Sequence, residues 1–131
     1  MKLFKNFVLF AASFALCGCA ASVDAGTIKG NLEGKGYTVS LIDGKDTVIS
    51  IEDVTKPEGL TNSLQAIKAP EAILAFFFDN IDHASSWFET NSSKLVGNRG
   101  PSGALLEKAG QKNNCVYLAT PTAFADSGIG D

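Results

Sequence analysis

The sequence has few of the residues that build disulfides, metal sites and basic surfaces. Its 131 residues include three cysteines, one histidine (His83) and one arginine (Arg99), with 11 basic residues against 14 acidic ones. A formal net charge of −3 gives no electrostatic basis for binding nucleic acid or an anionic membrane surface. There is no internal repeat and no low-complexity tract, so one domain is expected.

The first residues have the order of a secretory signal. Lys2 and Lys5 precede an apolar run from Phe7 to Leu16. This run is shorter than the roughly 20 residues that a membrane-spanning helix needs, so a permanent transmembrane anchor is not expected. The other interpretation, a buried core helix, leaves the lysines and the chain-initial position unexplained.

Leu16-Cys17-Gly18-Cys19 follows this run and resembles a bacterial lipobox, the motif that directs diacylglyceryl transfer to its cysteine. Cys17 departs mildly from the pattern, because a small residue such as Ala or Ser is usual there. The resemblance implies that residues 1–18 are a cleaved signal peptide and that Cys19 becomes the lipidated amino terminus, with palmitate among its acyl chains. The protein is then an exported lipoprotein, anchored to the outer face of the cytoplasmic membrane, or to the outer membrane if the envelope has one.

Removal of residues 1–18 leaves 113 residues with 9 basic and 14 acidic side chains, a formal charge of −5. This length suffices for a core without disulfide staples. Because lipid occupies Cys19, Cys115 has no partner for an intramolecular disulfide and is interpreted as a small buried hydrophobe on a strand. Residues 19–26 are expected to be a short tether of roughly 20 Å, and residues 27–131 a single domain.

Hydrophobic spacing predicts an α+β domain, with a mainly antiparallel sheet and helices packed against it. Helices are expected where apolar residues recur every three or four positions, and strands where they alternate or run unbroken. The expected helices cover residues 27–35, 60–67, a segment capped by Asp79 or Asp82 that ends near Gly97-Asn98, and 121–128. The expected strands cover residues 37–42, 48–51, 72–78 and 115–119.

Two of these segments carry the clearest signals. The unbroken apolar run from Ala72 to Phe78 indicates a central strand covered on both faces, since such a run promotes aggregation when exposed. The helix after it has one apolar face, with Trp87 beside that face. The residues expected on the face are Ile81, Ala84, Ser85, Phe88 and Leu95.

Residues 100–110 allow two interpretations. Pro101 is suited to begin a short helix through Leu105 and Leu106. Alternatively, Ala104 to Ala109 form the first arm of a hairpin that turns at 111–114. The hairpin is the favoured interpretation.

Four segments can also be read together as spaced motifs. They are Gly36-Tyr37-Thr38-Val39, Gly59-Leu60-Thr61-Asn62, Ala75-Phe76-Phe77-Phe78-Asp79 with Ala84, and Val116-Tyr117-Leu118-Ala119-Thr120 with Ala123. Their arrangement resembles that of small Firmicute lipoproteins of unknown function, although that family tends to have glycine where this chain has Ala119. The resemblance spans most of the mature chain and implies a fold and a location, and no catalytic residue.

His83 is the first residue to consider for chemistry, because Asp79, Asp82, Ser85 and Ser86 are close to it in sequence. On a helix Asp79 and His83 face each other, but Ser86 has no evident oxyanion donor. The favoured interpretation is a first-turn histidine beside capping acids. One histidine and one cysteine are too few for a zinc site, so no metal is expected.

Four other features have an ordinary structural interpretation. Gly97 to Gly103 contains Arg99 and matches neither the P-loop nor the dinucleotide spacing, which favours a surface loop over an anion cradle. Asp43 to Asp46 lacks the later ligands of a calcium loop and is expected to be a turn. Solvated loop charges are expected at Glu52, Asp53 and Glu58. A cluster of core aromatics is expected from Phe76, Phe77, Phe78, Trp87 and Phe88.

These observations predict a non-enzymatic accessory or interaction module with no cofactor, held at the membrane by lipid on Cys19 and in contact with an envelope protein. Two alternatives are a small-ligand-binding domain presented to a transporter and a small hydrolase that uses His83. A pocket lined by polar and apolar groups favours the ligand-binding domain. A hydrogen bond from His83 to a nucleophile, beside two oxyanion donors, favours the hydrolase.

Overall fold

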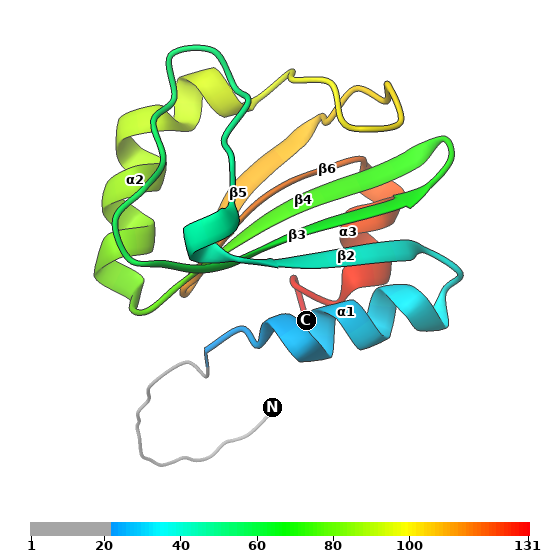
Figure 1. Cartoon of the computed structure of the whole chain (residues 1–131). Coiled ribbons are helices and arrows are strands. Elements are labelled where there is room, and N and C mark those ends of the chain that lie inside the picture. The colour runs from blue at the N-terminus through cyan, green and yellow to red at the C-terminus, as the bar shows by residue number, and fades with distance from the viewer. Residues whose placement is uncertain (1–21) are drawn as a thin grey trace, which may run out of the picture.

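The structure is a computed structural model that describes residues 22–131. The expected signal peptide, 1–18, and the lipidation site Cys19 lie outside the described residues. Figure 1 shows a sheet with helices on both sides. In chain order the elements are α1 (Ala25–Gly34), β2 (Thr38–Asp43), the 3-10 helix η1 (Gly44–Asp46), β3 (Leu60–Lys68), β4 (Glu71–Phe78), α2 (Ile81–Leu95), β5 (Lys108–Lys112), β6 (Cys115–Ala119) and α3 (Pro121–Ser127).

The strands form one antiparallel sheet in the order β2-β3-β4-β6-β5, which confirms the predicted α+β class. β4 is central, and its successive side chains point to opposite faces. Ile73 and Phe77 belong to the core on one face, while Phe76 and Phe78 belong to the core on the other. All four are buried, so the predicted central strand, covered on both sides, is confirmed.

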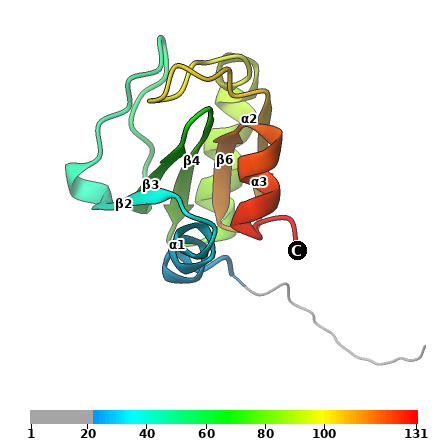
Figure 2. The same cartoon turned by 90° about the vertical axis from the view of Figure 1, so that its right-hand side faces the viewer.

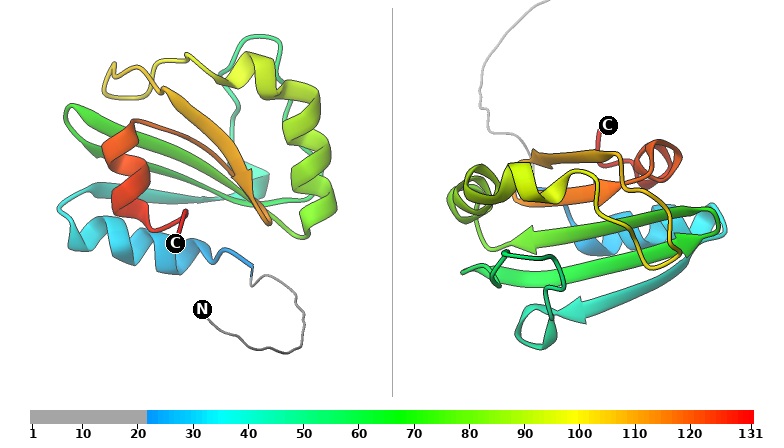
Figure 3. Two further views of the ribbon diagram at one scale, coloured as in Figure 1. Left: turned by 180° about the vertical axis from the view of Figure 1, so that it is seen from behind. Right: turned by 90° about the horizontal axis from the view of Figure 1, so that it is seen from above.

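One face of the sheet, called here the closed face, is covered by α1 and α3 (Figure 2; Figure 3, left). Ile28 and Leu32 lie one helical turn apart on α1 and are buried against the sheet together with Ala123 of α3. Tyr37, just before β2, donates a hydrogen bond from its hydroxyl to Asp126 Oδ2 at 2.8 Å. This contact joins the start of β2 to α3.

The other face, called here the open face, is covered by α2 and by the loop of residues 47–59 (Figure 1). α2 contacts β4, β5 and β6, which leaves β2 and β3 to the loop. Trp87 of α2 packs edge-on against Phe76, with ring centroids 5.3 Å apart. Its indole Nε1 donates to the carbonyl of Thr55 at 3.1 Å and so ties the loop to the helix.

Two sequence predictions on the open face are wrong. Residues 60–67 form strand β3 and not a helix, because this segment hydrogen-bonds to β2 on one side and to β4 on the other. Its alternation, with Leu64 buried on the closed face and Ser63 and Gln65 on the open face, fits a strand. Residues 48–51 form part of the loop and do not pair behind β2.

The predicted helix over α2 is confirmed, but its cap and its face differ from expectation. Asn80, and neither Asp79 nor Asp82, is the N-cap, and its side-chain oxygen accepts from the His83 backbone N–H at 2.8 Å. Ile81 is 48% exposed, because the buried face turns toward Trp87 instead. The buried residues of α2 are Ala84, Trp87, Asn91 and Leu95.

The favoured hairpin near the C-terminus is confirmed, with a first arm that starts later than expected. β5 begins at Lys108, and residues 101–107 are irregular apart from a single bridge between Arg99 and Leu105. The helix interpretation of this segment is therefore wrong. The helices expected at 27–35 and 121–128 are present as α1 and α3, and Gly128 ends α3 in the left-handed conformation.

Ordered contacts of the domain begin close to Cys19 in sequence. Val23 donates its backbone N–H to Asn114 Oδ1 at 2.7 Å, and Asn114 Nδ2 donates back to the Val23 carbonyl at 3.1 Å. Asn114 lies in the turn between β5 and β6, so this pair of bonds attaches the chain entrance to the sheet. Among the described residues, none of the helices is long and apolar enough to cross a membrane.

Candidate functional site

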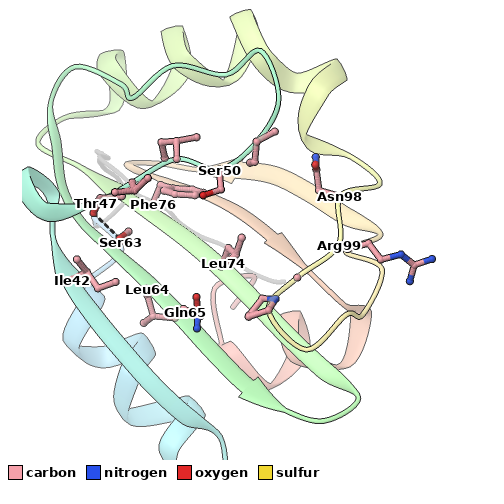
Figure 4. A pocket seen from close by; sticks show the side chains of 15 residues that line it. Ile42, Thr47, Ser50, Ser63, Leu64, Gln65, Leu74, Phe76, Asn98 and Arg99 are labelled. Carbon is pink, nitrogen blue, oxygen red and sulfur yellow. Dashed lines mark hydrogen bonds between the residues drawn. The ribbon is translucent and has the colours of Figure 1, made fainter.

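A pocket of about 310 Å³ opens on the part of the open face that α2 leaves uncovered (Figure 4). Its floor comes from neighbouring strands, where Ser63 and Gln65 of β3 lie opposite Phe76 and Leu74 of β4. Its walls are the loop after η1 and the loop after α2. This cavity, called here the sheet pocket, is lined by Ile42, Thr47, Val48, Ile49, Ser50, Ile51, Ser63, Leu64, Gln65, Leu74, Phe76, Asn98, Arg99, Gly100 and Pro101. Leu64 borders the cavity although its side chain belongs to the core of the closed face.

The lining combines apolar side chains with a buried polar pair. Thr47 and Ser63 are 6% and 7% exposed, and their hydroxyl oxygens are 2.7 Å apart. Thr47 Oγ1 also donates to the carbonyl of Asp43 at 2.9 Å. Of the 15 lining residues eight are apolar and six have polar side chains, and small-molecule sites also combine apolar surface with polar groups.

Arg99 and its glycine-rich loop form the outer wall of the pocket. The expected surface loop is confirmed, because no helix begins anywhere between Gly97 and Glu107, all of which the structure describes. Arg99 Nη1 donates to the carbonyl of Gly103 at 3.0 Å, and its guanidinium points away from the pocket (Figure 4). The anion cradle needs amides at a helix start, and this loop does not supply them.

His83 lies outside the sheet pocket, on the first turn of α2. Its Nδ1 is 2.7 Å from Asp79 Oδ1 and 3.4 Å from Asn80 Nδ2. The hydrogen bond that the protonated ring donates to the Asp79 carboxylate is the main cause that raises the pKa of His83 above its usual value. No hydroxyl or thiol is among the hydrogen-bond partners that the described residues give to this ring, so the His83 geometry lacks the nucleophile contact of a triad.

His83 is also packed against a glycine. Gly59 has a φ of +80°, and a Cβ added there would lie 2.3 Å from His83 Nδ1. The Gly59 carbonyl accepts from the Asp79 backbone N–H at 2.9 Å. Gly59, Asp79 and His83, called here the Gly59 junction, therefore hold the end of the 47–59 loop against the start of α2.

Cys115 is buried on the closed face, as predicted, and burial raises the pKa of its thiol to about 12. A thiol with so high a pKa is almost entirely protonated at neutral pH, and the thiolate is the reactive form. Cys115 is thus a packing residue in this fold.

The remaining features occupy separate places. Glu52, Asp53 and Glu58 are exposed on the 47–59 loop, as expected for solvated charges. Residues 43–46 form the turn that the sequence predicts, in part as the 3-10 helix η1. The expected aromatic core is divided, with Phe77 on the closed face and Phe76, Phe78, Trp87 and Phe88 on the open face. Within residues 22–131, no three His, Cys, Asp or Glu side chains gather as a metal site.

Sequence analysis missed Thr47, Ser63 and Gln65. Ser63 and Gln65 have a signal in the sequence: they alternate with the apolar residues Leu64 and Ala66, and this alternation predicts a strand with one polar face. Leu60, Leu64 and Ile67 follow helical spacing in the same segment and gave the competing helix interpretation. Thr47 has no comparable signal, because it meets Ser63 only in the folded chain.

Comparison with known proteins adds no family to this description. No family model, no curated protein and no solved structure matches the chain. The resemblance to small Firmicute lipoproteins stays a prediction.

Proposed function

We propose that this protein is a lipid-anchored cell-envelope module that binds a small molecule in the sheet pocket without changing it chemically. The observation that carries the proposal is the pocket itself, a cavity of about 310 Å³ with an apolar wall and a buried hydroxyl pair. Ligand sites typically have volumes of about 300–1,000 Å³ and this kind of lining. The ligand-binding alternative is therefore preferred over a module without a ligand.

The membrane address in this proposal is supported by the signal order and by the lipobox-like residues that end at Cys19. Val23, which is four residues after Cys19, is hydrogen-bonded to Asn114. Four extended residues span at most about 14 Å. The module then works close to the membrane, within reach of a transporter or another envelope protein.

The lipid part of the proposal is tested by mass spectrometry of protein extracted from membranes. We expect a diacylglyceryl group at Cys19, and Cys19→Ala should block processing. An unmodified Cys19 in a mature protein that starts elsewhere would contradict it.

The binding part is tested by native mass spectrometry of the processed protein purified from the envelope. Leu74→Trp adds bulk at the floor of the sheet pocket, and Ile81→Trp adds bulk at an exposed position of α2 outside the pocket. We expect a bound small molecule in the wild type and in Ile81→Trp, and none in Leu74→Trp. No bound molecule in the wild type, or the same amount in all three proteins, would refute ligand binding in this pocket.

A second candidate function is contact with an envelope protein. It is favoured by four exposed apolar residues on the segments that border the pocket: Ile42, Val48, Val96 and Leu105. Val48 is 82% exposed and lines the pocket together with Ile42, and exposed apolar side chains are common at interaction surfaces.

A photocrosslinking residue at Val48 tests this second candidate in cells. It should capture an envelope protein, whereas the same residue at Glu33 on α1 should not. His83→Ala should leave the yield unchanged, and Cys19→Ser should abolish it by releasing the domain. Turnover of an ester, peptide or glycan that His83→Ala abolishes would replace both candidates with the hydrolase.

A further inference from the structure

The interior of the sheet pocket carries no charge. Of its 15 lining residues only Arg99 is charged, and its guanidinium points away from the other lining side chains and donates to the Gly103 carbonyl (Figure 4). A charged ligand would lose its hydration in the pocket without gaining a counter-charge, which costs several kcal/mol. The lining therefore selects an uncharged ligand.

In the hydroxyl pair at one end of the pocket, the donor and the acceptor can be assigned. Thr47 has a single hydroxyl proton, and it is donated to the Asp43 carbonyl at 2.9 Å. In the 2.7 Å contact between the two hydroxyls, Ser63 must then be the donor and Thr47 the acceptor. Both protons are thereby used, and Ser63 Oγ keeps lone pairs that accept a hydrogen bond. A ligand needs an O–H or N–H group at this position.

The middle of the pocket offers a second polar group and an apolar surface. Gln65 lies two residues from Ser63 on the same face of β3. Its side-chain amide forms no hydrogen bond with any described residue. Leu74 and Phe76 lie beside these two residues on β4. The rest of the apolar lining comes from six residues: Ile42, Val48, Ile49, Ile51, Leu64 and Pro101.

From these groups we propose that the sheet pocket takes a small uncharged molecule with an apolar body and one hydroxyl or N–H group that donates to Ser63 Oγ. The body packs on Leu74 and Phe76, and Gln65 is placed to bond a further polar group. A volume of about 310 Å³ is near the lower end of the usual range for ligand sites, so the molecule has the size of a single ring with few substituents. This inference rests on the proposed function, because it names the ligand class of the same pocket.

Four cyclohexane derivatives test the ligand class on the full processed protein in lipid nanodiscs. Cyclohexanol has the required donor, methoxycyclohexane lacks it, and cyclohexanecarboxylate and cyclohexylammonium are charged at neutral pH. Trp87 is the only tryptophan of the chain, and its contact with Phe76 of the pocket floor makes its fluorescence a reporter of occupancy. None of the four probes absorbs where tryptophan is excited.

Cyclohexanol should bind with a Kd about 3- to 10-fold lower than methoxycyclohexane, the usual effect of one neutral hydrogen bond. The two charged probes should bind at least 10-fold more weakly than cyclohexanol. Ser63→Ala should raise the Kd of cyclohexanol to that of methoxycyclohexane and leave the latter unchanged. Ser93→Ala, on the exposed side of α2, is the matched control and should change neither Kd.

The outcomes separate this inference from the proposed function. If either charged probe binds as tightly as cyclohexanol, the uncharged class is wrong while the pocket remains a ligand site. If cyclohexanol and methoxycyclohexane bind equally in the wild type, the donor to Ser63 is wrong. If none of the four probes binds, this inference is overturned, and the native mass comparison of Leu74→Trp with Ile81→Trp decides the proposed function separately.

Discussion

The two faces of the sheet share the same strands and differ in what covers them. On the closed face two helices, α1 and α3, pack on residues such as Leu64 and Ile73, which are almost fully buried. On the open face one helix covers β4, β5 and β6, and the loop of residues 47–59 lies over the remainder. Helices cover a sheet with continuous side-chain packing, whereas a loop leaves space between itself and the strands.

In the proposed function, the same difference separates stability from binding. The closed face carries well-packed apolar residues and the buried thiol of Cys115. The open face carries the sheet pocket, its hydroxyl pair and most of the exposed apolar residues. Binding residues are often found on loops that a rigid scaffold positions, and here the closed face supplies the scaffold.

The largest expected effect comes from neighbouring residues of β4 that point to opposite faces. Ile73 is fully buried on the closed face, and Leu74 is half-buried at the floor of the sheet pocket. Ile73→Ala should lower the free energy of unfolding by about 2–5 kcal/mol, because it removes packed methyl groups and leaves a cavity. Leu74→Ala should cost about 1 kcal/mol, since its side chain already borders open space. Urea denaturation of both variants measures the contrast, and equal losses would contradict the distinction between the faces.

Glycine substitutions give the next largest effect, and they test how the 47–59 loop is held. Gly59→Ala should cost about 2–3 kcal/mol, because alanine is strained at a φ of +80° and its Cβ would clash with His83 and Asp79. Gly97→Ala has a similar φ of +87° and nothing within 4 Å, so it should cost only about 1 kcal/mol. Thermal unfolding measures both. Equal losses would mean that contact at the Gly59 junction adds nothing to backbone strain.

Much of the fold was predictable because several elements have local signals that agree with their tertiary role. β4 is a long apolar run in the centre of the sheet, and α3 begins with Thr120-Pro121 and ends at Gly128. The helix prediction for residues 60–67 is wrong because the apolar residues of β3 also fit helical spacing. Only pairing with β2 and β4 decides its conformation, and that pairing is a tertiary interaction.

The site was less predictable than the fold, and for a related reason. The sheet pocket joins residues from Ile42 to Pro101 that meet only after the strands pair and the loops fold over them. His83 and Arg99 are candidates for chemistry because each is the only residue of its type in the sequence. His83 lies outside the pocket, and the side chain of Arg99 points away from it. Serine, threonine and glutamine are common residue types and carry no such signal.

A smaller effect is expected from the hydroxyl of Tyr37, which bonds Asp126 on the closed face. Burial and this hydrogen bond raise the pKa of Tyr37 above its usual value near 10. Its contribution to stability is therefore fully present below about pH 10 and is lost as the pH rises through the folded-state pKa. Tyr37→Phe should lower the free energy of unfolding by about 1 kcal/mol at neutral pH and should remove part of the alkaline loss. Denaturant titrations at neutral and alkaline pH measure both effects.

The smallest effect is expected at the Gly59 junction, where His83 and Asp79 are each partly exposed to solvent. The hydrogen bond that the ring donates to the Asp79 carboxylate raises the pKa of His83, so the folded state favours the protonated ring. The stabilising contribution of His83 is then fully present below its unfolded-state pKa near 6.5 and is lost as the pH rises through the higher folded-state pKa.

Asp79→Asn removes the charged partner, and the pKa of His83 should fall back toward its ordinary value. Asp82→Asn is the matched control, because Asp82 is on the first turn of α2 and acts on His83 only as a weaker, purely coulombic partner. NMR titration of the His83 ring protons measures the pKa in the wild type and in both variants, and thermal unfolding across the same pH range measures the linked stability. If Asp82→Asn lowers the pKa as much as Asp79→Asn, the summed negative charge around His83, and not the direct hydrogen bond, raises the pKa of the ring. The loop would then be attached to α2 by packing at Gly59 and by the hydrogen bonds that Trp87 and Lys94 donate to the carbonyls of Thr55 and Asp53.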